Sequence, residues 1–289
     1  MTEAGYLPKI RIFLEMIKFS HTVFALPFAL TGALLAAGGL PSASQLFWIV
    51  LAMVGARTAA MSMNRLIDAR IDARNPRTAG RAIPAGLIGS GLTMLFIVLS
   101  TALMLLSAAT LNPLCLKLSP IALFFLVLYS YCKRFTALAH VVLGICLAAA
   151  PIGAWVAIRG QIDAPALVLG AIVLFWVAGF DILYALQDRE FDKSAGLHSI
   201  PVLLGVEGSL WTARMFHLVM LGLLLGLFSI MHLGSMFMIG ILVVAGMLMY
   251  EHWLLRDGDL EKLDAAFFNM NGYISVAIFL FTAAEVLTR

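Results

Sequence analysis

The sequence has little charge for its length. Only 12% of the 289 residues are charged, whereas soluble domains carry about 25%. Hydrophobic residues make up 62% of the chain, and the mean hydropathy is +0.99. These values exclude a soluble globular fold and favour a polytopic helical membrane protein. The apolar runs are continuous rather than alternating, which argues against a β-barrel.

Cysteine is also scarce, and net charge is low. Cys115, Cys132 and Cys146 have neither the paired spacing of a metal site nor a disulfide framework, so we expect free thiols. A net charge of +3 is too small to favour nucleic-acid binding, and no obligatory protein partner is evident. The N-terminus lacks the apolar core and small-residue cleavage site of a signal peptide, so we expect the first helix to remain as an anchor.

The apolar runs predict nine transmembrane helices, since about 20 apolar residues are needed to span a bilayer. They lie near residues 22–40, 46–68, 90–110, 114–131, 138–158, 165–187, 210–230, 234–254 and 266–287. We therefore expect one all-α transmembrane domain over residues 1–289. Residues 1–20 are expected to form an amphipathic lead-in at the membrane interface.

The distribution of basic residues sets the orientation. Most of the 19 lysines and arginines lie in the N-terminal segment and in the connections after the second, fourth, sixth and eighth spans. Cytoplasmic loops are enriched in these residues. The pattern predicts an inner-membrane protein with a cytoplasmic N-terminus and a C-terminus on the other side. Arg57 is an exception, because it lies inside the second span.

Two helix ends carry acidic side chains four residues apart. Residues at this spacing share one face of a helix, so each set forms a stripe, and both stripes fall at the predicted cytoplasmic face. The first stripe holds Asn64, Asp68 and Asp72, and the second holds Asp188 and Asp192, with Asp181 two turns earlier on the same face.

These stripes predict a site for a metal-bound diphosphate. A charged side chain at the bilayer centre costs roughly 2.5–3.5 kcal/mol, so the carboxylates should face a shared, wet cavity rather than lipid. Mg²⁺ suits such a site, because it binds one or two carboxylates together with phosphate oxygens and water. Cations from separate cytoplasmic segments could clamp the same phosphates. They are Lys18, Arg77, Arg81 and Lys133.

Several other residues are weaker candidates. Tyr129, Tyr131 and Tyr184 could line the path of a carbocation, because aromatic faces stabilise cations, although packing at the membrane interface explains Tyr131 equally well. Arg57 is expected to be functional or paired, because it lies in an apolar span.

Other polar and small residues have plainer interpretations. His21, His140 and His198 lie near the candidate segments, but histidines at helix ends are mostly structural. Gly222 and Gly226 have the spacing typical of close helix packing.

Five motifs together are similar to those of one family. They are Asn64-x-x-x-Asp68-x-x-x-Asp72, Arg77-Thr78-x-x-Arg81-x-x-Pro84, Tyr129-x-x-x-Lys133-Arg134-x-Thr136, Pro151-x-Gly153-Ala154-Trp155 and Asp181-x-x-Tyr184-Ala185-x-x-Asp188-x-x-x-Asp192. With these, the chain resembles the UbiA superfamily of intramembrane aromatic prenyltransferases over nearly its whole length.

The resemblance implies nine helices around a central cavity, Mg²⁺ dependence and a polyprenyl diphosphate donor. It also implies an aromatic acceptor such as 4-hydroxybenzoate, as used in quinone biosynthesis. The residues that would hold the Mg²⁺-diphosphate are Asn64, Asp68, Asp72, Asp181, Asp188 and Asp192, with Arg77, Lys133 and Arg134 on the phosphates and Tyr129 near the reacting carbon.

The first predicted span departs from the ubiquinone-type pattern. Lys18 stands where those enzymes have Arg, and Ser20 stands where they have Asp. This version resembles a branch linked to the futalosine route to menaquinone. The acceptor therefore stays open between 4-hydroxybenzoate and another aromatic acid.

Two other classes of protein could also use acidic residues in membrane helices. A CDP-alcohol phosphatidyltransferase also has Asp-x-x-x-Asp at a helix end, but its Asp-Gly-x-x-Ala-Arg lead is absent here and it needs no second stripe. A cation-coupled transporter could use membrane carboxylates, but its sites lie near the bilayer midplane, whereas both stripes fall at one face.

Overall fold

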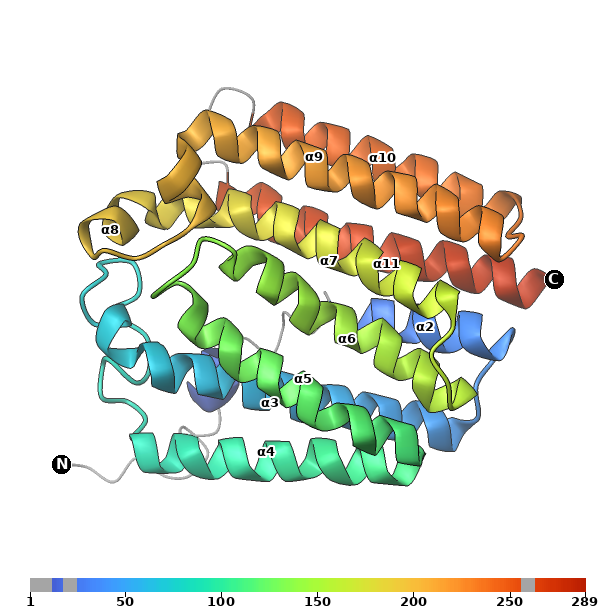
Figure 1. The fold of residues 1–289 in the computed structure, drawn as a ribbon, viewed down its shortest axis with the longest axis horizontal. Coiled ribbons are helices and arrows are strands. Elements are labelled where there is room, and N and C mark those ends of the chain that lie inside the picture. The colour runs from blue at the N-terminus through green and yellow to red at the C-terminus, as the bar shows by residue number, and fades with distance from the viewer. Residues whose placement is uncertain (1–11, 18–24, 256–262) are drawn as a thin grey trace.

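The computed structural model describes residues 12–17, 25–255 and 263–289, and all regular secondary structure in these ranges is helical (Figure 1). The elements are α2 (Leu26–Ala37), α3 (Ala43–Asp72), α4 (Ser90–Leu111), α5 (Pro113–Cys132), α6 (Ala139–Arg159), α7 (Ala164–Ala185), η2 (Leu186–Asp188), α8 (Arg189–Ser194), α9 (Ile200–Ile230), α10 (Ser235–Leu254) and α11 (Leu263–Thr288). The all-α prediction is confirmed.

Each of the nine predicted spans has a corresponding helix. Within the described ranges, eight helices are long and apolar enough to cross a membrane, and α2 is a shorter apolar helix of 12 residues. Part of the first predicted span, residues 22–24, lies outside the described residues. The nine-helix prediction therefore agrees approximately with the fold.

Helix α3 carries the first acidic stripe and has clear start and stop signals. Ser42 and Gln45 form a capping box at its N-terminus. The helix ends before Asn75-Pro76, where the proline disfavours helical backbone at the residue before it. The Thr78 hydroxyl then donates to the Asp72 carbonyl at 3.0 Å. Because α3 runs unbroken to Asp72, the predicted stripe on this helix is confirmed.

The second stripe is not on one continuous helix. Helix α7 ends at Ala185, and a 3₁₀ turn, η2, leads into the short helix α8. A 3₁₀ turn has three residues per turn rather than 3.6, which changes the angular phase of everything after it. The α7–η2–α8 segment is therefore helical but irregular, and all three residues, Asp181, Asp188 and Asp192, lie at the same end of it. That they share one face stays a prediction.

Helix α9 begins ten residues earlier than the predicted span. Ser199 caps it by accepting from the Val202 N–H at 3.3 Å, and Pro201 lies in its first turn. Gly205 then interrupts the helix with φ of 70°, a left-handed conformation that glycine adopts readily. The polar segment after α8 is consequently shorter than predicted and is held against the bundle.

The described part of the N-terminal lead-in, residues 12–17, packs beside α4. Phe13 stacks on Phe96 with ring centroids 3.7 Å apart, and Phe13, Met16 and Ile17 are buried while Leu14 is exposed. The Arg65 Nε donates to the Met16 carbonyl at 3.4 Å. The amphipathic prediction fits this packing, and its position along the membrane interface stays a prediction.

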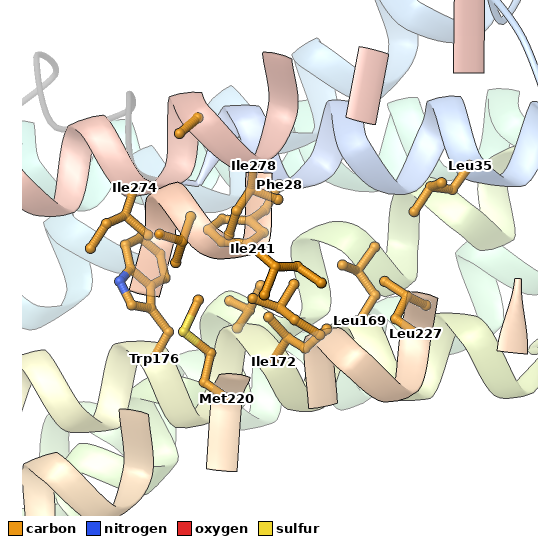
Figure 2. Packing of buried hydrophobic residues seen from close by; sticks show 14 of the residues in the cluster. Phe28, Leu35, Leu169, Ile172, Trp176, Met220, Leu227, Ile241, Ile274 and Ile278 are labelled. Atoms are coloured by element: carbon orange, nitrogen blue, oxygen red, sulfur yellow. The ribbon is translucent and has the colours of Figure 1, made fainter. Parts of the chain in front are cut away.

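The hydrophobic core lies where α2, α7, α9, α10 and α11 meet (Figure 2). Trp176 of α7 is completely buried at its centre, and the rings of Trp176 and Phe28 lie 4.9 Å apart. Met220 and Ile274 bring α9 and α11 into the same cluster. This core holds α7 in place, and with it the acidic residues at its C-terminal end.

Close helix packing depends on glycines other than the predicted pair. A Cβ added at Gly144 would lie 2.5 Å from the Leu174 carbonyl oxygen, and one at Gly55 would lie 2.7 Å from the Ser100 oxygen. Gly222 and Gly226 have open space instead, so the packing prediction for them is wrong. Spacing alone could not show which face of α9 meets another helix.

The Gly144 contact predicts a packing defect on substitution. Gly144→Ala should lower the midpoint of thermal unfolding in detergent, by a destabilisation of about 1–3 kcal/mol, because the methyl group must push α6 away from α7. Gly153→Ala on the same helix, where nothing lies within 4 Å, is the matched control and should not lower it. Equal midpoints for the two variants would contradict the close contact.

Candidate active site

The polar residues singled out from the sequence gather at one end of the bundle. This end holds the C-termini of α3 and α5, the loop of residues 73–89, the N-terminus of α6 and helix α8, on the left in Figure 1. Loop 73–89 is a series of turns in which Asn75 and Thr78 are buried. The backbone N–H of His198 donates to the Lys133 carbonyl at 2.7 Å. Segments far apart in the sequence thus meet here.

Asp68 lies buried between two basic residues from the end of α5. Its carboxylate is 3.0 Å from the Lys133 Nζ and 2.9 Å from Arg134, and it accepts a hydrogen bond from the Asn64 amide at 3.0 Å. Asp68 is only 3% exposed. Such a carboxylate needs charge compensation, which here comes from a different helix.

Asp72 has an arginine partner from the loop that follows it. One Arg81 nitrogen lies 2.8 Å from both carboxylate oxygens, and Asp72 is 3% exposed. This pair closes the first part of loop 73–89 onto the end of α3. Arg81 therefore lies where the sequence pattern placed it, beside the first acidic stripe.

Asp188 is bound from across the site by the same loop. Arg77 forms a two-nitrogen ion pair with it, and the Asn75 amide donates to it at 2.9 Å. The Tyr184 hydroxyl accepts from Arg77 at 3.2 Å, and the guanidinium lies over the tyrosine ring, 5.4 Å from its centroid. Burial lowers the pKa of Arg77, but hydrogen bonding and charge from Asp188 outweigh this and raise it, so Arg77 stays cationic.

The remaining two acidic residues have different surroundings. Asp181 is 2.7 Å from the Nδ1 of His140, and no arginine or lysine of the described ranges pairs with it. Asp192, in α8, is within electrostatic reach of Asp188 and Lys133. Tyr129 interacts electrostatically with both Asp68 and Asp181, which brings the two helix ends to one region.

The donor atoms fit a hard divalent cation. Carboxylate and amide oxygens are the ligands that Mg²⁺ prefers, and it commonly takes only one or two carboxylates together with substrate phosphates and water. In the part of the chain that the structure describes, no three acidic, histidine or cysteine side chains converge on one point. The carboxylates are instead neutralised by cations, which are the partners that an incoming diphosphate would bind.

Comparison with known proteins places this arrangement in a family. The model of the UbiA prenyltransferase family matches residues 25–273. The chain belongs to this family. It is 33% identical over 253 residues, 88% of each protein, to the 4-hydroxybenzoate octaprenyltransferase of Aliivibrio fischeri strain MJ11.

Two solved UbiA structures have the same fold. The apo structure of a UbiA homologue from Aeropyrum pernix K1 is 31% identical, with a TM-score of 0.84 over 93% of this chain and 98% of the other. A homologue from Archaeoglobus fulgidus, solved with GPP and Mg²⁺, is 21% identical with a TM-score of 0.69 over 95% of this chain and 99% of the other. The eight apolar helices and this family membership make the protein an integral membrane protein.

The structure brings most of the predicted site residues together. Those found in contact or electrostatic range at this end are Asn64, Asp68, Asp72, Arg77, Arg81, Tyr129, Lys133, Arg134, Asp181, Asp188 and Asp192. Lys18 and His21 lie outside the described residues. Their roles, like those of the whole set, stay predictions, and so does the central cavity.

Sequence reasoning missed Asn75, and the structure adds contacts for His140 and Tyr131. Asn75 joins the two acidic segments, and only its position before a proline in a polar loop could have drawn attention to it. His140 was expected to be structural, yet it contacts Asp181. Tyr131 is 44% exposed and lies beneath the Arg134 guanidinium, 5.2 Å from ring centroid to Cζ, which favours packing at the surface for this tyrosine.

The Asp72–Arg81 pair predicts a rescue effect on stability. Arg81→Ala should destabilise the protein by roughly 3 kcal/mol, because it leaves a buried carboxylate without its partner. Adding Asp72→Asn should recover most of the loss, since the amide carries no charge. Thermal unfolding of the two single variants and the double variant measures this, and additive effects would contradict the pairing.

Proposed function

We propose that the protein transfers a polyprenyl group from a polyprenyl diphosphate to an aromatic acid such as 4-hydroxybenzoate, in quinone biosynthesis. Membership of the UbiA prenyltransferase family and the name of the A. fischeri relative support this reaction. The observation that carries the proposal for the site is a set of carboxylates, each neutralised by a basic side chain from another segment. An acceptor from menaquinone biosynthesis is the second candidate.

The paired charges are suited to exchange their partners. When the donor binds, the basic side chains would leave their carboxylate partners and bind diphosphate oxygens instead. These side chains are Arg77, Arg81, Lys133 and Arg134. Guanidinium groups bind phosphate in a two-point geometry. The released carboxylates Asp68, Asp72 and Asp188 would then hold Mg²⁺ together with Asp192 and Asn64. Lys18 is proposed as a further phosphate contact. The exchange leaves no buried charge without a partner.

The basic residues and Tyr129 act on different parts of the donor. The allylic C–O bond breaks and its electron pair leaves with the diphosphate, whose growing negative charge the arginines and lysines stabilise. Bound Mg²⁺ would supply additional charge stabilisation at the same oxygens. Tyr129 offers its ring to the electron-poor allylic carbon. The aromatic ring forms the new C–C bond and then releases a proton, so the products are prenylated acid, diphosphate and one proton.

Arg57 is our candidate for the acceptor's carboxylate. It lies on α3, within a candidate membrane span, and its Nε has no hydrogen-bond partner among the described residues. Ionisable residues at membrane depth are costly and commonly mark function. Arg57 precedes Asn64 by seven residues, two helical turns on the same face, which places it deeper than the diphosphate region by about 10 Å.

The location of the reaction is also part of the proposal. The positive-inside distribution of Lys and Arg supports an inner-membrane protein with its N-terminus and active site at the cytoplasmic face. Membership of the family argues against the phosphatidyltransferase and transporter alternatives. We propose one transmembrane prenyltransferase domain, with membrane lipid around it and no obligatory protein partner.

A direct assay tests the proposed reaction. Membranes containing the protein are incubated with Mg²⁺, polyprenyl diphosphates of several lengths and several hydroxylated aromatic acids, and the products are identified by mass. Prenylated acid should form, and EDTA should stop its formation until Mg²⁺ is restored. Asp188→Asn should lower the rate at least about 100-fold, because it weakens the binding of Mg²⁺, whose charge would stabilise the leaving diphosphate.

The neighbouring acidic residue Glu190 is the matched control for Asp188. Its side chain is 80% exposed and forms an ion pair with the adjacent Arg189. Glu190→Gln should therefore keep wild-type activity. A wild-type rate in Asp188→Asn, or a rate indifferent to EDTA, would sink the proposed role of the carboxylates.

Arg57→Gln tests the proposed carboxylate contact. The variant should raise the KM for 4-hydroxybenzoate at least about tenfold, since it loses a charge-assisted hydrogen bond, and leave the donor KM within about twofold. 4-Hydroxybenzyl alcohol, which has no carboxylate, is the control substrate and should be used equally by both proteins. A loss of activity of the same size for both substrates would refute this contact.

A further inference from the structure

His140 joins three helices behind the proposed reaction centre. It lies in the first turn of α6 and is 4% exposed. Its Nδ1 is 2.7 Å from the Oδ2 of Asp181 on α7, and its Nε2 is 3.4 Å from the backbone nitrogen of Ile200, the first residue of α9. One imidazole ring therefore sets the relative position of Asp181 and the start of α9.

The two contacts determine which ring nitrogen carries the proton. The Ile200 N–H can only donate, so Nε2 must accept and has no proton of its own. The single proton of the neutral ring is then on Nδ1, where it donates to Asp181. A histidine held between a donor and a carboxylate in this way fixes the orientation of that carboxylate.

Asp181 differs in this respect from three other acidic residues of the site. Asp68, Asp72 and Asp188 have arginine or lysine partners, whereas Asp181 has a neutral one. Its second oxygen, Oδ1, has no hydrogen-bond partner among the residues that the structure describes, and its side chain is 19% exposed. A carboxylate oxygen left open beside a neutral partner is suited to accept a hydrogen bond.

The depth of Asp181 separates it from the diphosphate region. It precedes Asp188 by seven residues, which is about 10 Å along the segment. Tyr129 interacts electrostatically with Asp181, and Tyr129 is our candidate for the residue beside the reacting allylic carbon. Arg57 lies at the same offset from Asn64 on α3. Asp181 is thus placed beside the acceptor region rather than the leaving group.

We propose that the Oδ1 of Asp181 accepts a hydrogen bond from the phenolic hydroxyl of the aromatic acceptor, and that His140 is the positioning residue that holds Asp181 for this contact. The inference rests on the proposed function. The hydrogen bond draws electron density from the hydroxyl into the ring, which strengthens the ortho carbon as a nucleophile. It also fixes which ring carbon faces the allylic carbon of the donor, and it makes a hydroxyl donor a requirement for acceptors.

The first test compares acceptor analogues with the wild-type protein. 4-Aminobenzoate keeps a donor at the position of the hydroxyl, whereas 4-methoxybenzoate has none. Both compounds are tested as competitive inhibitors of 4-hydroxybenzoate prenylation. 4-Methoxybenzoate should bind at least about tenfold more weakly than 4-aminobenzoate, as expected for loss of a charge-assisted hydrogen bond. Equal inhibition by the two compounds would overturn the proposal without any variant.

The second test uses variants of the pair. Asp181→Asn should raise the KM for 4-hydroxybenzoate at least about tenfold, leave the donor KM within about twofold and reduce the preference for the amino over the methoxy inhibitor. His140→Ala should act in the same direction. His140→Gln should restore the acceptor KM to within about threefold of wild type, because a glutamine amide can accept from Ile200 and donate to Asp181.

Controls separate this role from the alternatives. His198→Ala alters an exposed ring next to the same helix start and should change neither KM. If Asp181→Asn instead shifts the Mg²⁺ concentration for half-maximal rate several-fold with an unchanged acceptor KM, Asp181 is a metal ligand and the proposal is overturned. A wild-type protein that prenylates no hydroxylated aromatic acid overturns the proposed function and this inference together. Wild-type transfer with unchanged acceptor selectivity in Asp181→Asn overturns the inference alone.

Discussion

The structure depends on neutralising carboxylates at one end of a membrane bundle. Asp68 and Asp72 are each 3% exposed, and a buried charge without a partner is strongly destabilising. Each of them takes its partner from another segment, Asp68 from the end of α5 and Asp72 from loop 73–89. The same loop reaches Asp188 through Arg77 and Asn75. Charge pairing thus adds to the apolar packing that holds these segments together.

This constraint also gives the site its proposed chemistry. A set of paired charges has little affinity for a lone anion or a lone cation, because either one would leave side chains of one sign without partners. A metal–diphosphate pair brings both signs and can satisfy both halves of every ion pair. Asp181, whose partner is the neutral His140, stands outside this exchange. The acidic residues therefore divide into a set suited to diphosphate and one residue suited to the acceptor.

Much of this organisation could be predicted from the sequence. Continuous apolar runs predict the helices, because a helix satisfies its own backbone groups in lipid. The four-residue spacing of Asn64, Asp68 and Asp72 predicts the stripe on α3. The second stripe could not be predicted in detail, since spacing assumes an unbroken helix and η2 interrupts it. Tertiary contacts such as Asn75 to Asp188 and His140 to Asp181 have no local signal. Spacing also could not show that Gly144, rather than Gly222, lies where two helices pack closely.

The coupling between the binding of Mg²⁺ and the binding of inorganic pyrophosphate tests the proposed exchange of charge partners most directly. Titration of the purified protein with pyrophosphate, with and without Mg²⁺, gives the two affinities, and the reciprocal titration must show the same coupling factor. The account predicts weak binding of either ion alone and a gain of at least about tenfold when both are present, since only the pair conserves charge balance. Tight binding of pyrophosphate in EDTA, equal to that in Mg²⁺, would contradict it.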